Sequence, residues 1–183
     1  VFFFTVDEEI TEQTVKEEFL RASEADVCFV TNDLKKQLPE LPQLEEKNCF
    51  DTGVAAYLVC PIQKGFSEED LSSEYAGFVM PAYSQNFGKK TIYQMWQQEK
   101  EEVQNYACYC ALVSYLSHKP LHRKLKTMKS YELFEQIEMP LVFTLYHMEQ
   151  EGICVKREAL RQYGENLGQR IEILEQEIYD LAG

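Results

Sequence analysis

Few side chains in this sequence have the type and spacing that chemistry requires. Asp51, in the segment FDTGVAAYLVCP, is either a free carboxylate or the N-cap of the helix that follows, and we favour the cap. His118, His122 and His147 have no carboxylate or Cys at ligand spacing, so none is predicted to be catalytic. The six cysteines lie mostly in apolar segments without CxxC spacing, which indicates buried thiols in a reducing compartment rather than disulfides or zinc ligands.

A basic cluster is the one feature that suits nucleic acid. It lies in SHKPLHRKLKTMK and comprises Lys119, Arg123, Lys124, Lys126 and Lys129. Two interpretations stay open: a solvated connector between domains, which we favour, or contact with DNA phosphates within a larger enzyme. The formal net charge of −13 argues against a self-sufficient nucleic-acid binder. No apolar run approaches the roughly 20 residues of a membrane span.

The elements that position these residues in the first half of the chain alternate between strands and helices. A hydrophobic content of 45% with 13% aromatic residues excludes a disordered chain. Strands are expected at residues 1–6 and 27–30, and helices at 11–22, 32–38, 53–59 and 67–77. Thr11 can cap the first of these helices, and Ser67 and Asp70 have capping-box spacing at the start of the last. This order predicts an α/β domain with a partly parallel sheet.

The second half is expected to be helical after a loop at residues 77–90. A helix should open at Thr91 and be broken by Pro120, with its aromatic stripe in the core. Ser130 should cap a second helix, which Pro140 kinks and Gly152 ends. Its expected buried face comprises Leu133, Phe134, Ile137, Leu141, Leu145 and Met148.

The last helix, residues 156–182, has apolar residues at alternating steps of three and four. They are Leu160, Tyr163, Leu167, Ile171, Leu174, Ile178 and Leu181. We expect this seam to pack on a neighbouring helix of the same protein, with free coiled-coil dimerisation as the alternative.

Two motifs carry a resemblance to a known family. IEMPLVFTLYHMEQEGICV resembles the segment by which family A DNA polymerases pass from the 3′–5′ exonuclease-like domain into the polymerase domain; the matching residues are Glu138, Pro140, Leu141, Met148, Glu149, Gly152 and Val155. FDTGVAAYLVCP is similar to a second motif of that family, and VFFFTVDEEIT and VCFVTNDLKKQL fit in order. The resemblance covers the whole chain, and residues 77–90 match least well.

The resemblance implies an RNase H-like α/β exonuclease-type domain, truncated at its N-terminus, over residues 1–129. Residues 130–183 would hold the connecting kinked helix and the first thumb helix. The parent would be a magnesium-dependent, DNA-directed nucleotidyltransferase of cytoplasmic replication and repair. Its partners would be DNA and the remaining polymerase domain in the same chain.

Active exonucleases of this family hold two metal ions with four carboxylates, aided by a Tyr. The first motif would precede Val1. At the second motif the position of the Asp is occupied by Lys36, and neighbouring Asp33 is expected to face away from it. At the third, Tyr106 is present but the Asp position holds Cys110. We therefore expect a structural, inactive exonuclease-like portion without a metal or cofactor.

Two rival functions remain at this point. One is an active metal-dependent 3′–5′ exonuclease domain whose first motif lies upstream. The other is a non-enzymatic helical interaction module that uses the seam of the last helix.

Overall fold

The computed structural model describes residues 1, 3, 5, 10–25, 27–41, 43–63 and 65–182, which form two compact units, Val1–His147 and Met148–Gly183. The strand expected at residues 1–6 lies for the most part outside the described residues. No helix in the described ranges is long and apolar enough to cross a membrane.

The first unit begins with a small α/β arrangement. Its elements are α1 (Glu12–Glu24), β1 (Phe29–Thr31), α2 (Leu34–Gln37), the 3-10 turn η1 (Glu46–Asn48), β2 (Cys49–Asp51) and α3 (Thr52–Val59). β1 and β2 pair in parallel, with Val30 opposite Phe50. The parallel pairing confirms the α/β prediction. β2 itself was not predicted, because three residues are too few to show a period.

Local side-chain signals set several helix ends as the sequence predicts. The Thr11 side chain accepts a hydrogen bond from the Thr14 amide at the start of α1. Ser67 and Asp70 form a reciprocal capping box on α4 (Glu68–Leu71). A π-helical turn, η2 (Ser72–Ala76), continues α4 and ends at Gly77, whose φ of +82° favours glycine.

The segment from Gly77 to Pro120 differs from the prediction in three ways. The expected loop contains α5 (Tyr83–Phe87), and the expected single helix is α6 (Ile92–Gln98) followed by α7 (Lys100–Thr127). α7 passes through Pro120, so Pro120 does not break it. Val113, Leu121 and Leu125 are fully buried on both sides of the proline. Burial of these side chains outweighs the one backbone hydrogen bond that proline removes.

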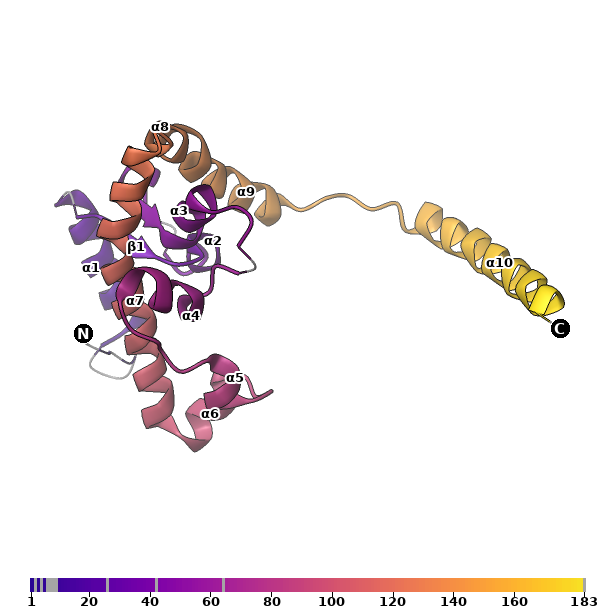
Figure 1. Cartoon of the computed structure of the whole chain (residues 1–183), viewed down its shortest axis with the longest axis horizontal. Coiled ribbons are helices and arrows are strands. Elements are labelled where there is room, and N and C mark those ends of the chain that lie inside the picture. The colour runs from indigo at the N-terminus through magenta and orange to yellow at the C-terminus, as the bar shows by residue number, and fades with distance from the viewer. Residues whose placement is uncertain are drawn as a thin grey trace. The chain divides into compact units, whose positions relative to one another are not determined.

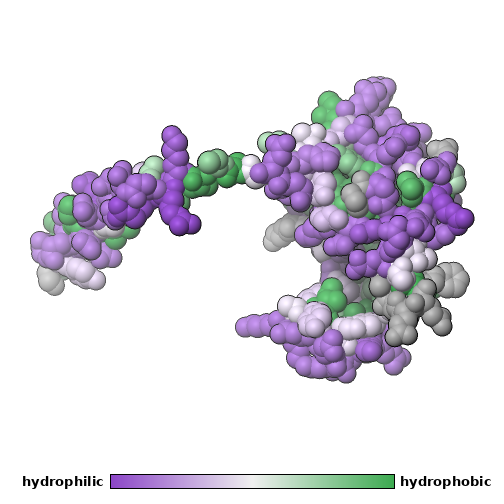
Figure 2. Space-filling model, turned by 180° about the vertical axis from the view of Figure 1, so that it is seen from behind, coloured by the Kyte–Doolittle hydropathy of each residue, from purple (hydrophilic) through white to green (hydrophobic). Residues whose placement is uncertain are grey.

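α7 is the central helix of the first unit. Figure 1 shows it running past β1 and α3, with α5 and α6 near one end and α8 near the other. The main core lies between these elements and includes Leu34, Phe50, Ala55 and Leu71 besides the α7 residues. A smaller cluster of Phe87, Met95 and Val103 joins α5, α6 and the start of α7. The visible face of this unit is largely hydrophilic, with apolar side chains set among the polar ones (Figure 2).

The helix after Ser130 is built from α8 (Tyr131–Leu133), the π-turn η3 (Phe134–Glu138) and α9 (Met139–Glu151). Ser130 stands at the cap position but makes no side-chain cap bond. The widened π-turn lies directly before Pro140, where it accommodates the ring and the missing amide.

The predicted buried face of this helix is wrong. Only Phe134 of the six residues is buried; Leu133, Ile137, Leu141, Leu145 and Met148 are exposed. Met139 and Val142 are buried instead, with Phe143 and Tyr146 packed against the same core. The reason is the π-turn. It makes the step between the buried residues Phe134 and Met139 five residues rather than three or four. A different stripe of the following helix therefore faces the core.

The second unit contains α10 (Arg157–Ala182), close to the predicted bounds. Gly152 has a φ of +69°, which confirms the predicted left-handed end of α9. The seven seam residues of α10 are all exposed. The six cysteines are free thiols, as predicted, but only Cys49 is buried, and Cys28 and Cys154 are exposed.

Candidate functional site: the cluster around Glu68

One buried carboxylate joins two helix N-termini beside the second predicted motif. Asp51 is 3% exposed at the end of β2. Its Oδ1 accepts hydrogen bonds from the amides of Gly53 (2.8 Å) and Val54 (3.1 Å) in α3. Its Oδ2 accepts one from the Leu34 amide (2.7 Å), the first residue of α2. Asp51 is therefore a structural cap for two helices, which confirms the favoured interpretation.

Lys36 lies on α2, one turn beyond that cap. Its Nζ forms an ion pair with Asp33 Oδ2 at 2.5 Å, and the Lys36 side chain is 82% exposed. The hydrogen bond to Asp33 is the main cause of a raised Lys36 pKa. The expectation that Asp33 faces away from Lys36 is therefore wrong. Asp33 is the N-cap residue of α2 in a left-handed conformation, which brings its carboxylate to the flexible Lys36 side chain.

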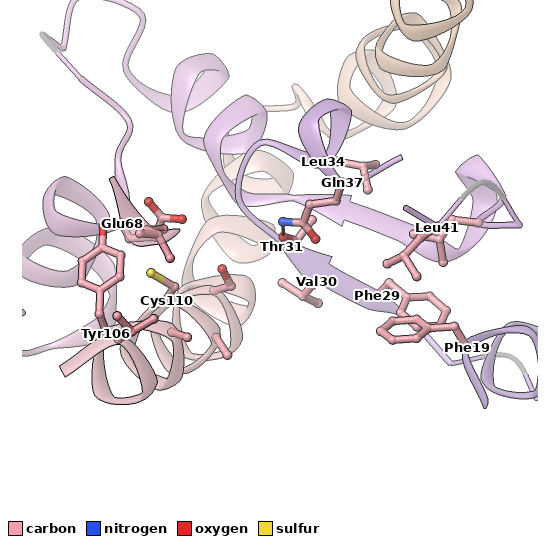
Figure 3. A pocket seen from close by; sticks show the side chains of 16 residues that line it. Phe19, Phe29, Val30, Thr31, Leu34, Gln37, Leu41, Glu68, Tyr106 and Cys110 are labelled. Atoms are coloured by element: carbon pink, nitrogen blue, oxygen red, sulfur yellow. Dashed lines mark hydrogen bonds between the residues drawn. The ribbon is translucent and has the colours of Figure 1, made fainter. Parts of the chain in front are cut away.

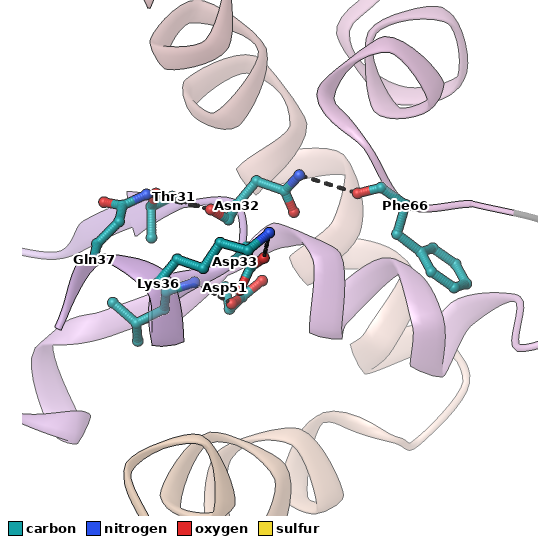
Figure 4. Close-up of polar contacts among 8 residues, drawn as sticks. Thr31, Asn32, Asp33, Lys36, Gln37, Asp51 and Phe66 are labelled. Carbon is teal, nitrogen blue, oxygen red and sulfur yellow. Dashed lines mark hydrogen bonds and ion pairs between the residues drawn. The ribbon is translucent and has the colours of Figure 1, made fainter. Parts of the chain in front are cut away.

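Polar contacts fix the loop that holds Asp33 (Figure 4). Asn32 Nδ2 donates to the Phe66 carbonyl at 3.0 Å, and Gln37 Nε2 donates to Thr31 Oγ1. A Cβ at position 53 would lie 2.5 Å from Asn32 Oδ1, so the close approach of this loop to α3 requires Gly53. The backbone before Lys36 is thus held in one arrangement.

Tyr106 and Cys110 are one turn apart on α7 and line a cavity of about 450 Å³ together with Glu68. Figure 3 shows the Tyr106 ring and the Cys110 sulfur on the side of this cavity that Glu68 occupies. The Tyr106 hydroxyl donates to Glu69 Oε1 at 3.3 Å, and the Tyr83 amide donates to the same oxygen at 2.9 Å. The Glu69 carboxylate is therefore engaged in holding α5 and α7.

The protonation states of these groups follow from burial and neighbouring charge. Burial, helped by the charge of Glu68, raises the pKa of the Cys110 thiol to about 12. Burial and the nearby Cys110, Glu69 and Glu68 also raise the pKa of Tyr106. For Glu69, burial opposes the charge, but hydrogen bonds led by that of the Tyr83 amide hold its pKa below the usual value. At neutral pH the site thus offers a protonated thiol and a protonated phenol.

Glu68 connects the second and third motif positions. It lines the Tyr106–Cys110 cavity and also a second cavity of about 650 Å³ that Lys36 lines. Its charge also raises the pKa of Lys36, as a minor contribution, and that of Cys110. Lys36 on one side and Tyr106 and Cys110 on the other therefore line two cavities that share Glu68. Glu68 is not among the site residues predicted from the sequence.

The residues at this site do not fit a pair of divalent metal ions. Such a pair requires several hard oxygen ligands, whereas the motif positions supply an ammonium group and a protonated thiol. In the described part of the chain, no group of three or more His, Cys, Asp or Glu side chains could hold a metal ion. Unscreened, Lys36 against a divalent cation at about 5 Å would cost roughly 6 kcal/mol at an effective dielectric of 20. Exposure and Asp33 reduce that repulsion, so the missing ligands are the stronger argument.

The structure divides the predicted basic cluster. Lys124 Nζ lies 3.9 Å from Glu74 Oε1 and 4.5 Å from the centre of the Tyr75 ring. Lys129 follows α7 with a φ of +60°. The other three members, Lys119, Arg123 and Lys126, line a separate cavity with His118, His122 and Thr127. His118 and His122, which have no carboxylate or Cys at ligand spacing, thus lie beside three cations.

A comparison with curated proteins finds DNA polymerase I of several bacteria. The chain is 29% identical over 137 residues to DNA polymerase I of Bacillus subtilis, covering 73% of this chain and 15% of that protein. It is 26% identical over 172 residues to DNA polymerase I of Caldicellulosiruptor bescii, covering 91% of this chain and 17% of that protein. It is 30% identical over 135 residues to DNA polymerase I of Streptococcus pneumoniae, covering 73% of this chain and 15% of that protein. No family model and no solved structure matches the chain.

These matches define the class of the chain as a DNA polymerase segment, in agreement with the two motifs. More specifically, the chain belongs to the bacterial DNA polymerase I family. It spans about one sixth of the length of the relatives that it matches.

Proposed function

We propose that this segment is the structural, catalytically inactive 3′–5′ exonuclease-like portion of a bacterial DNA polymerase I. Residues 1–129 would be an RNase H-like domain, and residues 130–183 would begin the polymerase domain. The parent would be a magnesium-dependent nucleotidyltransferase that acts on DNA in cytoplasmic replication and repair. The activities of the whole enzyme belong to this proposal because the chain spans only 15% of a typical relative.

The observation that supports inactivity is the state of the motif positions around Glu68. Lys36 is a cation bound to Asp33, and Cys110 is a thiol whose pKa is raised to about 12. Glu69 already accepts two hydrogen bonds within the protein, which leaves Glu68 as the carboxylate of this cavity without such a role. Asp33, Asp51 and Glu138 also line the neighbouring Lys36 cavity, but Asp33 is paired with Lys36 and Asp51 accepts hydrogen bonds from three backbone amides. Among the described residues these carboxylates form no group that could hold a metal ion, as two-metal phosphodiester hydrolysis requires.

The observation that supports a structural role is the exposed apolar stripe on α8, η3 and α9. Leu133, Ile137, Leu141 and Leu145 follow one another at steps of four and are 39–56% exposed. A contiguous apolar stripe of this kind marks an interaction surface. The remaining polymerase domain is the partner we propose, because the relatives are about six times as long as this chain.

Calorimetric titration with Mn²⁺ tests the proposed inactivity of the site. We expect no saturable binding that depends on Glu68 in the chain as given. The matched variant Lys36→Asp/Cys110→Asp restores two carboxylates and should bind Mn²⁺ measurably better. Saturable binding by the unaltered chain that disappears in Glu68→Gln would contradict the proposal.

A second candidate function, a helical interaction module, draws on α10. Its seam residues are exposed, Leu167 at 45% and Ile171 at 55% among them. Self-association through this seam would appear in sedimentation velocity as a concentration-dependent rise in mass, which Ile171→Asp should abolish. A monomer at all concentrations would exclude this candidate.

A further inference from the structure

The second half of α7 has a charge distribution unlike the rest of the chain. The chain contains 31 acidic residues, yet none lies between Glu102 and Glu132 in the sequence. All five members of the basic cluster fall within that interval. A protein of net charge −13 thus carries a 29-residue acid-free interval with five cations, whereas the acid-free interval between Glu74 and Glu99 contains only Lys89 and Lys90.

Three of those cations form a stripe on one side of α7. Lys119, Arg123 and Lys126 are spaced by four and three residues, which places them on a common helix face. His118 and His122 lie on the same face, and these five side chains with Thr127 line a cavity of about 420 Å³. We call these five residues the α7 basic stripe. Among the described residues, neither Lys119 nor Arg123 forms an ion pair.

Aromatic side chains of β2 and α8 pack against three residues of the α7 basic stripe. The His118 ring packs edge-on against Phe50 of β2, with centroids 4.5 Å apart. The His122 ring makes a similar contact with Tyr131 of α8 at 4.8 Å. Lys126 Nζ lies 5.0 Å from the centre of the same Tyr131 ring. The stripe is therefore anchored to the core by its imidazoles.

We propose that the α7 basic stripe binds the backbone phosphates of DNA, and that protonation of His118 and His122 strengthens the binding. Lys119, Arg123 and Lys126 lie along about 10 Å of helix, so their long side chains can each reach a backbone phosphate. Contacts of this kind position a protein on DNA without reading its sequence. The inference rests on the proposed role of DNA as a partner but does not depend on whether the nuclease site is inactive.

The charges around each imidazole set the direction of the pH effect. Burial, with the neighbouring His122 and Lys119, lowers the pKa of His118. Burial and Lys126 lower that of His122, against an opposing contribution from Glu135 of η3. Tyr131, the other titratable group packed on His122, is neutral at the pH values that matter, because burial raises its pKa. Both histidines are therefore mostly neutral above pH 6.5 in the free protein.

A bound phosphate favours the charged imidazole and so raises its pKa. By linkage, binding takes up protons, and the affinity for DNA increases as the pH falls. Because both imidazoles line the same cavity as the three cations, we expect the effect to depend on both.

The test is fluorescence anisotropy with a labelled random-sequence duplex and the whole chain. At low salt and pH 6, Lys119→Gln/Arg123→Gln/Lys126→Gln should weaken binding by about tenfold or more and reduce the slope of log K against log salt by about 2–3. The matched control Lys89→Gln/Lys90→Gln/Lys100→Gln removes the same charge from exposed positions near α5 and α6 and should bind within about twofold of the parent chain.

The imidazoles are tested by the pH dependence of the same assay. From pH 7.5 to pH 5.5 the affinity of the parent chain should rise by about tenfold, and His118→Gln/His122→Gln should remove most of that rise. Because His118 packs on Phe50, His122→Gln alone is the second variant, and it should remove part of the rise. Thermal unfolding confirms that each variant is folded.

Equal binding by the stripe variant and its matched control would overturn the proposal, and so would a pH dependence that survives in the histidine variants. Neither result would bear on the nuclease site. Conversely, Mn²⁺ binding at Glu68 would overturn the proposed inactivity and leave the stripe untouched.

Discussion

Asp51 offers the sharpest prediction for the fold of the first unit, because one carboxylate caps two helices. Asp51→Ala removes the acceptor of three amides: Leu34 at the start of α2, and Gly53 and Val54 at the start of α3. Each buried amide left without a partner costs about 1–3 kcal/mol, offset in part because the buried charge is also removed. We expect Asp51→Ala to lower the free energy of unfolding by about 2–4 kcal/mol.

Asp51→Asn separates the loss of hydrogen bonds from the loss of volume. The side-chain oxygen of asparagine can accept a hydrogen bond from either the Leu34 amide or the α3 amides. Its NH₂ group then faces the remaining backbone N–H, and two donors cannot form a hydrogen bond with each other. The expected cost is about 1–2 kcal/mol, less than for Asp51→Ala. The matched control is Asp33→Asn. Asp33 is ion-paired with exposed Lys36, its own side chain is 44% exposed, and asparagine tolerates its left-handed backbone, so the cost should be below about 0.5 kcal/mol.

The assay is urea unfolding of each variant at a series of pH values from about 3.5 to 8. Burial raises the pKa of Asp51 above its ordinary value of 3.8, against the three amide hydrogen bonds, which lower it. With a raised folded-state pKa, the stability from this group is complete below the unfolded-state pKa and is lost as the pH rises through the folded-state pKa. The advantage of the parent chain over Asp51→Asn should therefore shrink as the pH rises from below 3.8 through the folded-state pKa. If both Asp51 variants unfold within about 0.5 kcal/mol of the parent, the double cap is not a stabilising element.

Two further predictions concern packing and thiol reactivity. In urea unfolding, Met139→Ala should lower the free energy of unfolding by about 2–4 kcal/mol and Leu145→Ala by less than about 1 kcal/mol. The reason is that Met139 is 3% exposed and Leu145 is 39% exposed. The reverse order would show that the stripe containing Leu145 is the buried one. Iodoacetamide at pH 8 should alkylate exposed Cys154 quickly and Cys49 and Cys110 slowly, because burial is the main cause that raises the pKa of each of these two thiols to about 12. Comparable alkylation rates by peptide mass spectrometry would contradict the raised pKa values of Cys49 and Cys110.

What could be predicted from the sequence lies in short-range signals. The caps at Thr11, Asp51 and Ser67 depend on residues within three positions, and the structure has all of them. The left-handed end at Gly152 follows from the same kind of signal. A partly parallel sheet was also predicted, but β2, which pairs with β1, was not, and the predicted strand at residues 1–6 lies mostly outside the described residues.

What failed depends on contacts that no local pattern encodes. The π-turn before Pro140 adds one residue to the helical step, so a search for steps of three and four selected the exposed stripe. Pro120 stays helical because Val113 and Leu121 are buried in one core. The bond between Tyr106 and Glu69 joins residues 37 positions apart, so Glu68 and Glu69 carried no local signal of belonging to the site.

The central claim is that the exonuclease-like portion no longer cuts DNA, and a direct nuclease measurement on the whole polymerase that contains this segment tests it. The substrate is a single-stranded oligonucleotide labelled at its 5′ end, with Mg²⁺ or Mn²⁺ and without deoxynucleotides. We predict that the oligonucleotide keeps its full length, because Lys36 and Cys110 cannot replace two carboxylates as metal ligands. A metal-dependent ladder of products shortened from the 3′ end, abolished by Glu68→Gln or Tyr106→Phe, would contradict the account.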